Sequence, residues 1–142
     1  MNNCKNEYKN RNTCFHAKCA LAQLDDKQYQ KEVFANLSSI NSKDLVEYYL
    51  PSVSFIRIPE SSNLLVKIMN DNTCKMIYDF DTNEQEPCSA KVINTIVEMT
   101  SNVPQELKKV SNGASPDSKK VEQSKKWINQ NKNKLKMRTE TY

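Results

Sequence analysis

The middle of the chain reads Val53-Ser-Phe-Ile-Arg-Ile58, then Leu64-Leu-Val-Lys-Ile-Met69, then Lys75-Met-Ile-Tyr-Asp-Phe80. Each run alternates apolar and polar residues over part of its length, which is the period of a strand with one buried face. Polar segments of turn-forming residues separate the runs, Pro59-Glu-Ser-Ser-Asn63 and Asn70-Asp-Asn-Thr73. Because loops this short join neighbouring antiparallel strands, the stretch predicts a three-stranded antiparallel meander.

A helix is predicted directly after the meander, over Cys88–Met99. Its apolar positions follow helical spacing and form one stripe, which consists of Val92, Ile93, Ile96, Val97 and Thr100. The β-branched content lowers helix propensity, so packing against the sheet has to stabilise this helix. We therefore expect one core between the meander and the helix, made of Val53, Phe55, Leu64, Val66, Ile68, Met76, Tyr78, Val92, Ile96 and Val97.

The N-terminal third favours helices that follow a flexible segment over residues 1–13. Residues 15–24 are rich in Ala and Leu, and Asp25 or Asp26 can cap a second helix. That second helix repeats an apolar residue every four positions, at Tyr29, Val33 and Leu37.

A third short helix is predicted over residues 43–50. Asn41 is suited to cap its beginning, and Pro51 is expected to end it.

A last helix is predicted over residues 116–135, with Ser115 as its N-cap and Pro116 at its first position. Its apolar residues recur every seven positions, at Val121, Ile128 and Leu135. The fold class that follows is α+β: N-terminal helices, a three-stranded antiparallel meander, a packed helix and a basic C-terminal helix. The expected organisation is a core domain over residues 14–110, followed by the basic helix and tail over residues 111–142.

Charge is distributed unevenly along the chain. Residues 105–142 contain ten Lys or Arg and four Asp or Glu, a net charge of +6, whereas the other residues carry −2. This asymmetry predicts an exposed basic helix over residues 117–138 that binds a glycosaminoglycan or another polyanion by charge. The expected binding residues are Lys119, Lys120, Lys125, Lys126, Lys132, Lys134 and Lys136.

Several ligand classes are disfavoured by composition. Gly113 is the only glycine, and phosphate-binding loops of nucleotide sites need several, so no cofactor is expected. Trp127 is the only aromatic residue in the basic stretch, whereas single-strand nucleic-acid binders interleave several, so nucleic acid is disfavoured. No apolar run approaches the length of about 20 residues that spans a bilayer, so no membrane span is expected.

The five cysteines lie at positions 4, 14, 19, 74 and 88. Cys74 and Cys88 flank the third predicted strand and its exit loop, and we expect them to form a disulfide that closes a loop of about 15 residues. The pairing of Cys4, Cys14 and Cys19 stays open, as does the alternative that the cysteines are reduced. A zinc site that combines these three cysteines with His16 has a spacing unlike the usual fingers, and no metal is expected.

Two arrangements of residues have catalytic potential, and neither predicts an enzyme. His16 lies two residues from Cys14 and three from Cys19, which leaves no third group to orient an imidazole base. Asp79 and Asp81 could face a common cleft at the end of the third strand, but such acidic pairs are more typical of solvated turns.

Residues 114–136 resemble the end of a CXC chemokine. Their sequence is Ala-Ser-Pro-Asp-Ser-Lys-Lys-Val-Glu-Gln-Ser-Lys-Lys-Trp-Ile-Asn-Gln-Asn-Lys-Asn-Lys-Leu-Lys, and in that family a proline turn likewise leads into an amphipathic, lysine-rich helix with a tryptophan. A three-strand meander followed by a helix is also similar to the chemokine plan. In a second register, Cys74 and Cys88 correspond to the third and fourth cysteines of the family. The resemblance implies a cytokine-like ligand.

Taken together, these features predict a secreted protein-binding ligand or modulator, cytokine-like or a host-interaction factor, with a polyanion-binding tail and a protein receptor or partner. The main alternative is an intracellular adaptor or regulatory subunit with reduced cysteines. A small carboxylate-dependent enzyme is the third hypothesis. Whether Asn36, in the sequon Asn36-Leu-Ser38, carries a glycan is left open.

Overall fold

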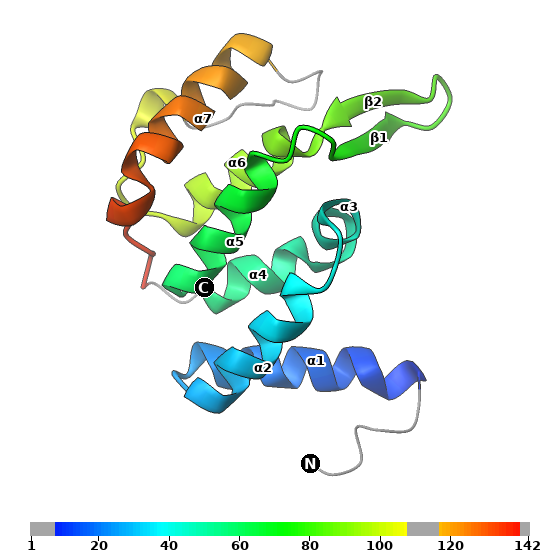
Figure 1. Cartoon of the computed structure of the whole chain (residues 1–142), viewed down its shortest axis with the longest axis vertical. Coiled ribbons are helices and arrows are strands. Elements are labelled where there is room, and N and C mark those ends of the chain that lie inside the picture. The colour runs from blue at the N-terminus through cyan, green and yellow to red at the C-terminus, as the bar shows by residue number, and fades with distance from the viewer. Residues whose placement is uncertain (1–7, 108–116, 140–142) are drawn as a thin grey trace. The chain divides into compact units, whose positions relative to one another are not determined.

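The computed structural model describes residues 8–107 and 117–139, and most of these residues are helical (Figure 1). They form two compact units, which divide between Ile40 and Asn41. The predicted domain boundary between residues 110 and 111 lies outside the described residues. The elements are α1 (Tyr8–Gln23), α2 (Lys27–Ser38), α3 (Ser42–Asp44), a π-helical turn (Leu45–Tyr49), α4 (Leu50–Ile56), α5 (Pro59–Met69), β1 (Lys75–Asp79), β2 (Glu84–Pro87), α6 (Cys88–Met99), a 3-10 turn (Gln105–Leu107), α7 (Ser118–Asn131) and a second 3-10 turn (Lys132–Lys134).

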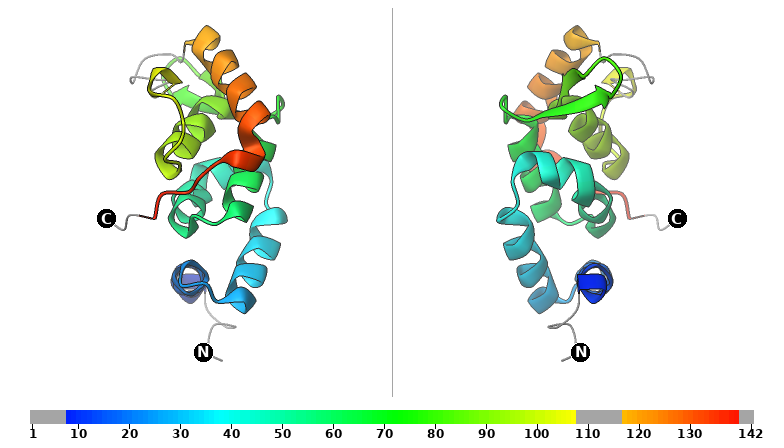
Figure 2. Two further views of the ribbon diagram at one scale, coloured as in Figure 1. Left: turned by 90° about the vertical axis from the view of Figure 1, so that its left-hand side faces the viewer. Right: turned by 90° about the vertical axis from the view of Figure 1, so that its right-hand side faces the viewer.

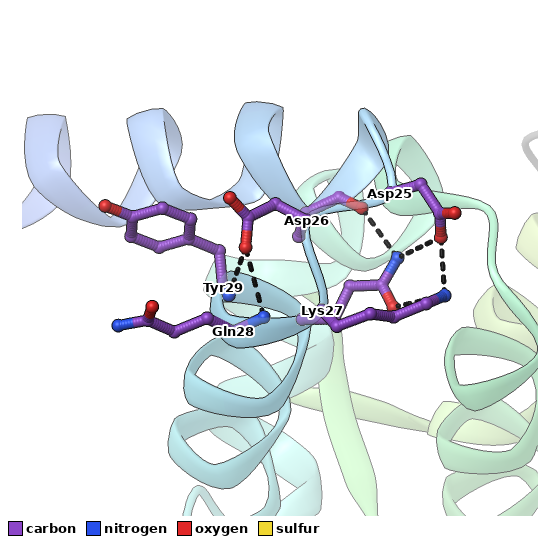
Figure 3. Close-up of polar contacts among 7 residues, drawn as sticks. Asp25, Asp26, Lys27, Gln28 and Tyr29 are labelled. Carbon is purple, nitrogen blue, oxygen red and sulfur yellow. Dashed lines mark hydrogen bonds and ion pairs between the residues drawn. The ribbon is translucent and has the colours of Figure 1, made fainter.

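The first unit is a hairpin of α1 and α2. Of the two predicted candidates, Asp25 and Asp26, Asp26 is the N-cap of α2. Its carboxylate accepts hydrogen bonds from the backbone N–H groups of Gln28 and Tyr29 (Figure 3). The buried amide of Gln30 donates to the carbonyl oxygen of Ala22 at 2.9 Å, which ties α2 to the end of α1.

The second unit begins with a cap at Asn41, whose side chain accepts from the backbone N–H of Asp44. The prediction that Pro51 ends this helix was wrong, since Pro51 lies in the first turn of α4. Pro51 has no N–H to donate to the carbonyl of Glu47, and its ring would approach that carbonyl closely. The wider π-helical turn over Leu45–Tyr49 accommodates both the missing hydrogen bond and the bulk of the ring, so the chain stays helical through Pro51.

The predicted three-stranded meander was wrong. Its first two runs are helices, α4 and α5, and only the third forms a strand, β1. The partner of β1 is β2, which lies in the segment that was predicted as a loop, and the sheet is a two-stranded antiparallel hairpin within the described residues. The fold of this unit is therefore α-rich with a small sheet, not α+β with a meander.

The residues that α4 and α5 bury explain why the alternation of apolar and polar residues in these runs does not indicate strands. In α4 the buried residues include Leu50, Val53 and Ile56, which share one face at every third position. Arg57 then adopts a left-handed conformation (φ 48°) that ends α4, and Pro59 opens α5 at its first turn. The hydroxyl of Ser61 accepts from the backbone N–H of Ile58, so α5 has a beginning that alternation alone did not reveal.

The core of this unit surrounds α6, whose predicted bounds are confirmed and whose stripe is buried. The stripe packs on helices rather than on a sheet, because α6 contacts α4, α5 and α7. Of the expected core residues, the structure buries Val53, Val66, Ile68, Val92, Ile96 and Val97. Phe55 was assigned to the core wrongly, since 46% of it is exposed, and Leu64 and Met76 are half-buried.

The predicted Cys74–Cys88 disulfide is present, with its Cα atoms 5.4 Å apart. The backbone N–H of Cys88 also donates to the carbonyl of Cys74 at 3.0 Å. Both cysteines are buried, and Cys88 is the first residue of α6. The bridge therefore closes the base of the β1–β2 hairpin and fixes it to the central helix.

Ser124 on α7 is a buried hydroxyl for which the described residues provide no hydrogen-bond partner. Burying an unsatisfied polar group costs about 1–3 kcal/mol. We therefore expect Ser124→Ala to raise the free energy of unfolding by about 1 kcal/mol, and Ala also has the higher helix propensity. Urea denaturation of the two proteins measures the difference. A clear loss of stability in the variant would mean that the hydroxyl does have a partner.

Candidate functional site

The basic surface suggested by the sequence begins on α7. Asp117 caps this helix, because its carboxylate accepts from the backbone N–H groups of Lys119 (3.0 Å) and Lys120 (3.2 Å). One face of α7 is buried by Val121, Ser124 and Ile128, and the helix contacts α5 and α6. Lys119 and Lys126, seven positions apart, consequently share the opposite, exposed face.

The prediction of a helix over residues 117–138 was wrong beyond Asn131. The chain tightens into a 3-10 turn over Lys132–Lys134 and then runs extended to form a bridge between Met137 and Thr100 (Figure 2, the red segment). The predicted start at Ser115 and Pro116 lies outside the described residues.

This extended segment is held in place by the residues that follow α6. The side chain of Asn102 donates to the carbonyl of Lys134 (2.8 Å) and accepts from the backbone N–H of Lys136 (2.9 Å). Arg138 donates through its backbone N–H to Met99 O (2.8 Å) and through Nε to Thr100 O (3.0 Å). The exposed side chains of Lys132, Lys134 and Lys136 therefore project from a backbone with fixed contacts.

Of the seven lysines that the sequence predicts to bind a polyanion, Lys125 differs from the other six in its exposure. Only 15% of its side chain is exposed, and Nζ donates to Asn72 Oδ1 at 3.3 Å. Glu122 Oε1 lies 3.9 Å from the same ammonium. Lys125 thus links α7 to the loop before the hairpin, while the other six lysines are exposed and define what we call the basic surface: Lys119, Lys120, Lys126, Lys132, Lys134 and Lys136.

The charge of this region is strongly positive. Residues 117–139 include eight Lys or Arg and two acidic residues, a net charge of +6. Asp117 is occupied as the helix cap, and Glu122 lies beside Lys125. Among the described residues, neither acid therefore forms an ion pair with any of the six exposed lysines, so their charges repel one another and a bound anion would relieve the repulsion.

Of the two carboxylates at the hairpin, that of Asp79 forms the turn, and Asp81 contributes its backbone N–H. Asp79 Oδ1 accepts from the backbone N–H groups of Asp81 (2.9 Å) and Thr82 (3.2 Å). The hydrogen bonds from Thr82 and Asp81 lower the pKa of Asp79. A general acid at neutral pH needs the opposite shift of its pKa, so the contacts of Asp79 suit it to fixing the turn.

The cysteines near His16 lie on α1, and His16 is exposed. Cys14 is disulfide-bonded. Cys19 is a buried free thiol, and burial raises its pKa to about 11, away from the range of a reactive thiolate. Residues 8–107 and 117–139 contain no group of three metal-ligating side chains close enough to hold an ion.

Sequence reasoning missed Phe80, which lies in the turn between β1 and β2 with 85% of its surface exposed. The alternating pattern predicts Phe80 as the last apolar residue of the third strand. Its position between Asp79 and Asp81 was the available signal, because an aromatic residue flanked by two turn-forming aspartates is suited to a tip.

No family model, curated protein or solved structure matches the chain. The resemblance of residues 114–136 to CXC chemokines accordingly stays a hypothesis. In the part of the chain that the structure describes, none of the helices is both long and apolar enough to cross a bilayer. What the structure defines is an α-rich domain with a disulfide-closed hairpin and a basic surface.

Proposed function

We propose that this protein binds sulfated polysaccharides through the basic surface. The observation that carries the proposal is the set of six exposed lysines on α7 and on the bonded segment after it. A polyanion gains from such a cluster by releasing its condensed counterions, and this gain does not depend on a shaped pocket.

A fixed backbone favours this binding further. Lys134 and Lys136 are held through Asn102, so binding has to order only their side chains. Trp127, by contrast, is half-buried, so it does not offer the open stacking face that single-stranded nucleic acids use. The chemistry therefore favours a sulfated glycan over a nucleic acid.

The wider role that we propose is a secreted ligand or modulator that also binds a protein receptor. Support comes from the Cys74–Cys88 bridge and the disulfide-bonded Cys14, because disulfides persist in oxidising compartments. An intracellular adaptor would have to keep these cysteines reduced. The disulfides thus favour the extracellular role.

The test replaces Lys119, Lys126, Lys132 and Lys134 with Gln, and leaves Lys125 and its hydrogen bond to Asn72 intact. We expect the wild-type protein to be retained on heparin and to elute at a salt concentration well above physiological. The variant should elute earlier, and the slope of log affinity against log salt should fall by about one for each lysine that contacts the glycan. Heparin chromatography and salt-dependent calorimetry measure both effects.

A matched control replaces four exposed lysines elsewhere, Lys31, Lys43, Lys67 and Lys91, with Gln. This control has the same net charge as the test variant, so it separates a local surface from an overall attraction. Equal weakening by both variants, or no retention of the wild type, would contradict the proposal.

A further inference from the structure

The β1–β2 hairpin is held at its base and at its turn, and it presents its tip to solvent. In the antiparallel pairing of its strands, Lys75 lies opposite Pro87 and Asp79 lies opposite Glu84. The Cys74–Cys88 bridge closes the base of the hairpin. At the tip, Asp79 fixes the turn through two backbone hydrogen bonds, and Asn83 takes the left-handed conformation (φ 55°) that closes it. A tip fixed at both ends loses little conformational freedom when it binds.

Phe80 is the exposed group at this tip, and the turn itself does not require an aromatic residue there. Rigid, protruding aromatic side chains are typical anchors of protein interfaces. The hairpin around it is acidic, since residues 75–87 contain four Asp or Glu and one Lys, a net charge of −3. The tip therefore fits a partner surface that is basic and that can cover an aromatic ring.

The same chain carries a surface of that chemistry. Lysines offer aliphatic stems that cover a ring and ammonium groups that attract its face. The six lysines of the basic surface also complement the negative charge of the hairpin. In Figure 1 the turn between β1 and β2 projects away from α7. This arrangement favours a contact of the tip with a second molecule.

We propose that the Phe80 tip of one molecule docks on the basic surface of a second copy. If the contact is reciprocal, two tips and two basic surfaces engage in one symmetric dimer. Sulfated glycans and the hairpin then compete for the same lysines, and glycan binding releases the monomer. The dimer uses the lysines of the proposed function but does not require glycan binding.

Sedimentation equilibrium of the full chain tests this at about 20 mM and about 300 mM salt, on either side of physiological screening. We expect a dimer at the lower salt that dissociates at the higher salt. Phe80→Ser should weaken it about tenfold, and Asp81→Lys should weaken it similarly. The side chain of Asp81 is exposed and the turn uses only its backbone N–H, so this change leaves the turn intact. Phe55→Ser, which alters the other exposed phenylalanine, is the control and should leave the dimer unchanged.

A mixing experiment distinguishes this contact from others. The Phe80→Ser/Asp81→Lys protein keeps its basic surface, and the quadruple Lys→Gln protein keeps its tip. Each should be monomeric alone, and an equimolar mixture should form a heterodimer through one intact contact, visible by native mass spectrometry. A short heparin fragment should dissociate both dimers.

A wild-type protein that stays monomeric at low salt would overturn the dimer, as would a dimer that Phe80→Ser does not weaken. Heparin retention without a dimer would support the proposed glycan binding and contradict the dimer. A dimer in a protein that heparin does not retain would support the dimer and contradict the proposed glycan binding.

Discussion

Ile96→Ala should lower the free energy of unfolding of the second unit by about 2–5 kcal/mol. Ile96 is 1% exposed and lies in the middle of α6, the helix that α4, α5 and α7 all contact. Removing three carbons there leaves a cavity that helices on several sides cannot all fill. Helix propensity opposes the effect, because Ala favours helix more than Ile does, so the loss has to come from packing.

Urea denaturation followed by the fluorescence of Trp127 measures this loss in the right unit, because Trp127 is the only tryptophan and belongs to α7. Phe55→Ala is the informative comparison. Phe55 belonged to the expected core but is 46% exposed, and we expect its replacement to cost about 1 kcal/mol or less. Equal losses in the two variants would mean that α6 is not the centre of the core.

The sequence alone predicted the structure correctly where neighbouring residues determine it. Asp26 and Asn41 have cap-forming side chains, and both act as caps. The stripe of α6 extends from Val92 to Thr100, long enough that only a helix buries it on one face. The disulfide followed from the spacing of Cys74 and Cys88 around one predicted strand.

The meander could not be predicted correctly because runs of six apolar and polar residues fit a strand and a helix equally well. The deciding information lay outside the runs. Pro51 and Pro59 both occupy first-turn positions, which are typical of helix beginnings, whereas the sequence prediction places a helix end at Pro51 and a loop at Pro59. The left-handed Arg57 then separates the two helices without a glycine, in a chain that has only one.

Charge made the basic surface predictable, but tertiary contacts decided its details. The side chain of Asn102 and the backbone after α6 bond the segment beyond Asn131, and no local pattern encodes that pairing. Lys125 is mostly buried through Asn72, which is 53 residues away in the sequence. Phe80 stands out only once the strand is seen to end at Asp79.

The Cys74–Cys88 bridge is relevant both to the proposed glycan binding and to the proposed dimer. It joins the loop after α5 to the first residue of α6, and the loop also holds Asn72, the partner of Lys125 on α7. The hairpin and the middle of α7 are therefore both linked to the segment that this buried bridge holds in place. We expect removal of this bridge to affect stability and tip rigidity together.

Replacing both Cys74 and Cys88 with Ala should lower the free energy of unfolding by about 3 kcal/mol. The bridge closes a loop of 15 residues, and the chain-entropy model assigns about that value to the constraint it places on the unfolded chain. The variant is preferable to a reducing agent, because Cys14 is also disulfide-bonded and would be reduced as well.

Urea denaturation monitored through Trp127 measures the loss, and it also separates its causes. A less constrained unfolded state should raise the dependence of unfolding on urea or leave it unchanged, whereas a disturbed native core would lower it. Amide hydrogen exchange should accelerate most in β1 and β2, whose base is opened, and less in the middle of α6. A loss under about 1 kcal/mol, with hairpin exchange unchanged, would mean that strand pairing alone fixes the tip.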